Sequence, residues 1–78
     1  MDVWFMYDNH RFSMIGDSST TSREAMEIKA RECFGRDGSG TLFAIDSQGQ
    51  PVADCQDEFD MPEFFDLIEE HMNWEARG

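Results

Sequence analysis

Closely spaced carboxylates are the chemical groups that stand out in the last third of the chain. Residues 54–78 hold nine Asp and Glu against a single basic residue, Arg77, and carry a net charge of −8, whereas residues 1–53 carry −3. Such side chains can hold a metal ion, transfer a proton, or attract a positively charged partner. Their spacing decides between these three kinds of chemistry.

Two acidic stretches start like a calcium-binding loop, but neither continues as one. An EF-hand loop needs glycine at its sixth position and Glu at its twelfth. In the stretch that starts at Asp37 these positions hold Leu42 and Gln48. In the stretch that starts at Asp54 the sixth position holds Phe59. The sequence therefore predicts no calcium site in either stretch.

Cysteine and histidine are the other residues with chemistry of their own. They occupy four positions: His10, Cys33, Cys55 and His71. No two of them have the Cys-x-x-Cys or His-x-x-x-His spacing of zinc ligand pairs. The chain also lacks Gly-x-Ser-x-Gly, the phosphate-binding Gly-x-x-x-x-Gly-Lys and His-Glu-x-x-His. A Cys–His nucleophile pair would have to be assembled by the fold, so we expect a protein that is not an enzyme and holds no metal or other cofactor.

The carboxylates instead recur at helical spacing. Residues three and four apart on a helix are neighbours, and like charges at these positions cost a few tenths of a kcal/mol. No Lys or Arg lies between positions 54 and 74 to relieve that repulsion. This pattern is typical either of a solvated surface or of an anionic array that resembles a phosphate backbone. We call the candidate surface the acidic face, and it comprises Asp54, Asp57, Glu58, Asp60, Glu63, Asp66, Glu69 and Glu70.

Two predicted helices organise most of the apolar residues. The first begins at a capping box formed by Thr21 and Glu24, and Gly35 predicts a left-handed end. The second begins at Asp60 with Pro62 in its first turn, where the missing amide costs nothing. The first helix has an apolar stripe of Met26, Ala30, Cys33 and Phe34. The stripe of the second is Met61, Phe64, Phe65, Ile68 and Met72, flanked by Leu67 and Trp74, and Asn73 lies on its acidic side.

Four short strands complete the predicted fold. Residues 3–7, 11–15, 41–45 and 52–55 are rich in strand formers and are bounded by turn residues. The order is therefore ββαββα. One antiparallel sheet with both helices packed on one face is the simplest α+β arrangement that buries both apolar stripes.

Length and charge indicate a single small domain spanning residues 1–78. The net charge of −11 excludes nucleic acid and anionic membranes as direct partners, because like charges repel. Seven Phe, two Trp and six Met argue for an ordered core, since burying each such side chain stabilises by roughly 1.5–3 kcal/mol. The longest apolar run, residues 3–7, is too short for a membrane span or a signal peptide. We expect a cytoplasmic monomer with both cysteines reduced.

The chain resembles the anti-CRISPR proteins of phages and mobile elements. The resemblance lies in its small size, its low isoelectric point, its α+β pattern, its acidic helical face and its lack of catalytic motifs. It implies a DNA mimic that occupies the nucleic-acid channel of a type I CRISPR surveillance complex in the host cytoplasm. Our leading hypothesis is thus a small inhibitor that binds a basic nucleic-acid-binding surface through the acidic face.

The aromatic segment at residues 4–7 supports an alternative. Trp4, Phe5, Met6 and Tyr7 are consecutive, so in a strand two of them point to each side of the sheet. Two would remain outside the core and form an apolar interface patch. On this hypothesis the chain is an adaptor or antitoxin-like module, and its acidity serves solubility alone.

Overall fold

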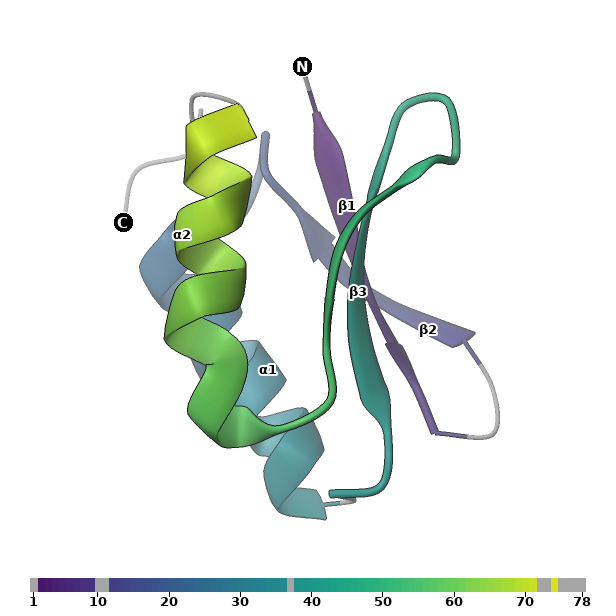
Figure 1. Cartoon of the computed structure of the whole chain (residues 1–78), viewed down its shortest axis with the longest axis vertical. Coiled ribbons are helices and arrows are strands. Elements are labelled where there is room, and N and C mark those ends of the chain that lie inside the picture. The colour runs from purple at the N-terminus through teal and green to yellow at the C-terminus, as the bar shows by residue number, and fades with distance from the viewer. Residues whose placement is uncertain (1, 10–11, 37, 72–73, 75–78) are drawn as a thin grey trace.

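A computed structural model describes residues 2–9, 12–36, 38–71 and 74 (Figure 1). Its elements are β1 (Val3–Asp8), β2 (Phe12–Asp17), α1 (Arg23–Arg36), β3 (Thr41–Asp46), β4 (Pro51–Cys55), the short 3₁₀ helix η1 (Glu58–Asp60) and α2 (Met61–His71). The four strands form one antiparallel sheet in the order β2-β1-β3-β4. The predicted α+β fold and its ββαββα order are confirmed.

Both helices lie on the same side of the sheet (Figure 1). Alternate residues of the two central strands point toward them and are buried: Val3, Phe5 and Tyr7 on β1, Leu42 and Ala44 on β3. The predicted helical stripes meet this face, and all of their described members are buried. Phe65 is fully buried, so the predicted register of the second helix is correct. Met72 lies outside the described residues.

Trp74 joins the end of the described chain to the beginning of α1. Its ring stacks on Phe5, with centroids 5.3 Å apart and planes at 20°. Its indole Nε1 donates a 2.6 Å hydrogen bond to the carbonyl oxygen of Thr21. A buried tryptophan needs such a partner for its N–H. The two contacts therefore hold Trp74 against the core, beside the residues that precede α1.

Both predicted boundaries of the first helix are wrong in detail. Ser22 caps α1 in place of Thr21, because its Oγ accepts the amide hydrogen of Ala25 at 3.2 Å. Gly35 lies inside α1, which continues to Arg36. A single glycine costs a helix only about 1 kcal/mol, so it does not have to end one.

The start of the second helix also differs from the prediction. Asp57, rather than Asp60, supplies the capping carboxylate, which accepts from the Phe59 amide at 2.9 Å. The chain thus turns once as η1 before it becomes α2, and Asp60 is the last residue of that turn. Pro62 does lie in the first turn of α2, as predicted.

Candidate functional site

All eight carboxylates of the acidic face are exposed. They follow the chain from the edge strand β4, through η1, and along α2, which are continuous with one another in space (Figure 1). The predicted residues thus lie along three consecutive elements of the folded chain. Asn73, which we predicted to lie beside them, is outside the described residues.

Arg23 of α1 neutralises part of this surface, which the sequence did not indicate. Its guanidinium donates to Asp66 Oδ1 at 2.9 Å, to Glu69 Oε1 at 3.0 Å and to Glu27 Oε1 at 2.8 Å. The guanidinium carbon also lies 5.8 Å from the ring centroid of Phe65. Partial burial opposes the charge, but the three hydrogen bonds outweigh it and raise the pKa of Arg23 above its ordinary value. Arg23 therefore stays protonated and holds two carboxylates of the acidic face.

Two further members of the acidic face are also engaged. Glu58 Oε1 lies 3.7 Å from Arg31 Nε, and both side chains are about half exposed, so this pair contributes little. The carboxylate of Asp57 is used to cap η1. The remaining four carboxylates make no ion pair with any residue that the structure describes: Asp54, Asp60, Glu63 and Glu70.

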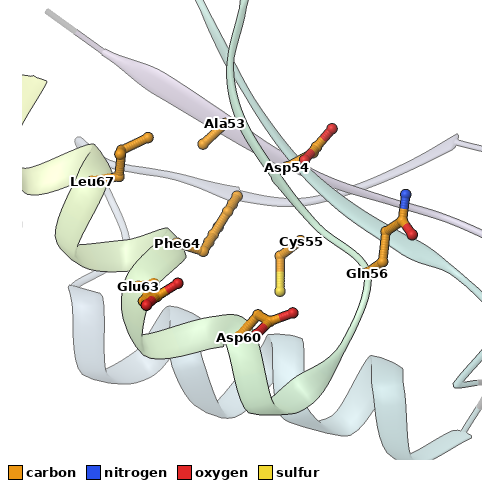
Figure 2. A pocket seen from close by; sticks show the side chains of 8 residues that line it. All are labelled: Ala53, Asp54, Cys55, Gln56, Asp60, Glu63, Phe64 and Leu67. Atoms are coloured by element: carbon orange, nitrogen blue, oxygen red, sulfur yellow. The ribbon is translucent and has the colours of Figure 1, made fainter.

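A groove of about 550 Å³ separates β4 from α2, and we call it the β4–α2 groove (Figure 2). Residues 53–56 form one wall, and Asp60, Glu63 and Leu67 form the other, with the buried Phe64 between them. Figure 2 shows the carboxylates of Asp60 and Glu63 turned toward the same space as the thiol of Cys55. Asp54 points away from that space, on the other side of β4. The groove thus combines apolar surface with carboxylates at its rim.

The thiol of Cys55 is only 3% exposed at the base of this groove. Its Sγ donates a 3.0 Å hydrogen bond to the carbonyl oxygen of Asp57. Burial is the main cause that raises the pKa of Cys55, and the carboxylates of Asp60, Asp57 and Asp54 raise it further. The thiolate is the nucleophilic form, so the groove suppresses the reactivity of this cysteine.

The other predicted chemical groups are not assembled into a site within the described part of the chain. Cys33 is buried in the core, and both cysteines are free thiols. No group of three His, Cys, Asp or Glu among residues 2–9, 12–36, 38–71 and 74 is placed to hold a metal ion. His10 lies outside these ranges.

The opposite face of the sheet carries a second apolar surface. Strand pairing places Met6 between Phe43 and Met14, and Trp4 next to Ile45. Neither helix covers this side (Figure 1). Met14 is 63% exposed, and its four neighbours on this face are half-buried. We call this surface the outer sheet face, and it comprises Trp4, Met6, Met14, Phe43 and Ile45. Of the aromatic segment, therefore, alternate residues do point away from the core.

Comparison of this chain with protein-family models, curated proteins and solved structures finds no match. Within the described residues, no helix has both the length and the apolar character needed to cross a membrane. The site must therefore be interpreted from its own geometry and charge.

Proposed function

We propose that this protein is a small acidic inhibitor that binds a positively charged, nucleic-acid-binding surface of another protein. The observation that carries the proposal is the exposure of all eight carboxylates of the acidic face along β4, η1 and α2. Four of them have no basic neighbour in an ion pair among the described residues. A partner that supplies Lys and Arg would relieve their mutual repulsion, which gives binding a favourable electrostatic component.

The mode of action we propose is mimicry of DNA. Duplex DNA presents one negative charge per about 1.7 Å of helix axis, and proteins neutralise it with Lys and Arg. The acidic face offers a shorter run of closely spaced charge to the same side chains. The resemblance to anti-CRISPR proteins suggests the nucleic-acid channel of a type I surveillance complex as one such target. We propose that the protein acts as a monomer in the cytoplasm, which is consistent with its two free thiols.

Capture of the partner from host extract tests the proposal. The protein serves as immobilised bait, and bound proteins are eluted with a salt gradient and challenged with duplex DNA. We expect a nucleic-acid-binding protein that elutes at moderate salt, because the exposed ion pairs are screened. We also expect duplex DNA to displace it, because both ligands occupy one basic surface. A partner that resists salt and ignores DNA would contradict the proposal.

The outer sheet face supports a second candidate function. Trp4 and Met6 lie there with Phe43, uncovered by either helix (Figure 1). A partly exposed apolar surface of this kind is typical of protein–protein contacts. An adaptor or antitoxin-like module would bind its partner through these residues. In that case Trp4→Ala abolishes binding, whereas neutral substitutions in the acidic face leave it unchanged.

A further inference from the structure

We infer that the β4–α2 groove receives an extended, Lys- or Arg-bearing segment of the partner, which adds to the sheet as a strand alongside β4. The inference rests on the proposed function, because it names the part of a basic partner that the acidic face contacts. It is carried by three features of the groove: an open strand edge, an apolar wall and unpaired carboxylates.

The first feature is the free edge of β4. This strand pairs with β3 on one side, and no strand pairs with its other side within the described chain. An open edge presents backbone N–H and C=O groups that another chain can pair with. Pro51 has no N–H and blocks only the beginning of the strand. Val52 falls at an irregularity in the register with β3, so residues 53–55 remain as the regular template, which limits the added segment to about three to five residues.

The second feature is the wall that α2 contributes. Leu67 is 43% exposed and lies in the groove beside the buried Phe64. A strand added to β4 would point alternate side chains toward this wall and toward the opposite side. The apolar wall thus gives the added segment surface to bury, in addition to backbone hydrogen bonds.

The third feature is charge. Asp60 and Glu63 face the groove, and neither pairs with a described cation. Asp54 lies on the other side of β4, where the next side chain of an added strand would point. Cations are thus favoured on both sides of the segment. An anionic or strongly acidic segment would be repelled, which makes the groove selective for basic sequences.

Peptide binding tests the inference at 0.15 M salt, where charges more than about 8 Å from the peptide are largely screened. The probe is an eight-residue peptide that repeats Arg-Arg-Val-Val, so that each side of the strand carries both residue types. Two further peptides carry N-methyl groups, one on the odd-numbered amides and the other on the even-numbered amides. In a strand these two sets of amides point in opposite directions, so only one set can face β4. We expect one methylated peptide to lose about tenfold or more in affinity, because several backbone hydrogen bonds are removed, and the other to bind like the parent.

Two matched substitutions test the charge. Glu63→Gln removes a groove carboxylate, and Glu32→Gln removes an exposed carboxylate of α1 that belongs neither to the groove nor to the acidic face. We expect the first to weaken peptide binding about threefold to fivefold and the second by less than twofold. Thermal unfolding confirms that both variants are folded.

The other outcomes overturn the inference. They are the absence of parent-peptide binding, equal affinity of all three peptides, loss in both methylated peptides, or equal effects of the two substitutions. Binding of a captured basic partner to the acidic face would still support the proposed function in those cases. If neutralising the acidic face leaves that partner's affinity unchanged, the proposed function fails independently of the peptide result.

Discussion

Arg23 of α1 and Asp66 of α2 are joined by a 2.9 Å ion pair at the border of the acidic face. The same guanidinium holds Glu69 and packs near the ring of Phe65. It therefore links the two helices and lowers the negative charge that α2 presents to solvent. Arg23 therefore has opposite effects on stability and on partner binding. Its ion pairs hold α1 and α2 together, but they also occupy Asp66 and Glu69, which are candidate contacts for a basic partner.

Substitution of Arg23 by Gln separates these two roles. We expect the free energy of unfolding to fall by about 1–2 kcal/mol, since exposed ion pairs contribute at most about 1 kcal/mol each and the aromatic contact about 0.5–1 kcal/mol. We expect affinity for a basic partner to rise, because Asp66 and Glu69 become available. Denaturant unfolding and titration calorimetry measure the two effects. A loss of affinity in a folded variant would contradict this account of the acidic face.

The raised pKa of Cys55 predicts slow alkylation. Only the thiolate is alkylated, so a raised pKa leaves less of the reactive form at neutral pH. The alkylation rate should therefore rise at a higher pH than it does for an ordinary thiol. In a Cys33→Ala variant, iodoacetamide should modify Cys55 more slowly than it modifies free cysteine at pH 8. Unfolding in denaturant should restore the ordinary rate. Equal rates in the folded protein would show that the groove does not shield the thiol.

The same shift predicts a dependence of stability on pH. The folded pKa of Cys55 lies above the unfolded value, so the unfolded chain loses this proton first as the pH rises. The stability that the buried thiol contributes is fully present below the pKa of the unfolded chain. It is lost as the pH rises through the pKa of the folded protein. We expect wild type to lose more stability than a Cys55→Ala variant between pH 8 and pH 10. Equal losses of stability in the two proteins, measured by denaturant unfolding at each pH, would contradict the prediction.

Substitution of Gly40 and of Gly35 by alanine should change the stability of the protein in opposite directions. A Cβ on Gly40 would overlap the ring of Tyr7, whereas a Cβ on Gly35 meets no atom within 4 Å. Gly40→Ala should therefore destabilise by about 1–3 kcal/mol through overpacking. Gly35→Ala should stabilise by about 0.5–1 kcal/mol, because Gly35 lies inside α1. Thermal unfolding of the two variants measures the direction of each stability change. A change in the same direction for both would contradict this packing of the two glycines.

Local periodicity explains why the fold could be predicted from the sequence. The stripes around Met26 and Phe65 recur at helical spacing, and each stripe needs a sheet to cover it. Chemically equivalent neighbours limited the detail: Thr21 and Ser22 can both cap a helix, and Asp57 and Asp60 can both start one. These ambiguities shift a boundary by a few residues without changing the architecture.

The candidate site was predicted less completely. Exposure of the acidic-face residues on α2 followed from their position away from the apolar stripe of that helix. The pairing of Arg23 with Asp66 depends on which sides of α1 and α2 meet, and nothing local in the sequence encodes that. The β4–α2 groove likewise depends on how β4 and α2 pack together, which no local sequence pattern determines. The consecutive apolar residues 4–7 left open which pair points outward, until the strand register placed Trp4 and Met6 on the outer sheet face.

The affinity of matched charge variants for a captured basic partner tests the central claim most directly. Glu63→Gln with Glu70→Gln removes two unpaired carboxylates from the acidic face on α2. Glu24→Gln with Glu32→Gln removes two exposed carboxylates from α1, so the net charge and residue types match. We predict that the α2 pair weakens binding at low salt by about 1–2 kcal/mol and flattens its salt dependence, while the α1 pair changes it by less than about 0.5 kcal/mol. Equal losses for the two pairs, or no loss for the α2 pair, would contradict the claim that the acidic face binds the partner.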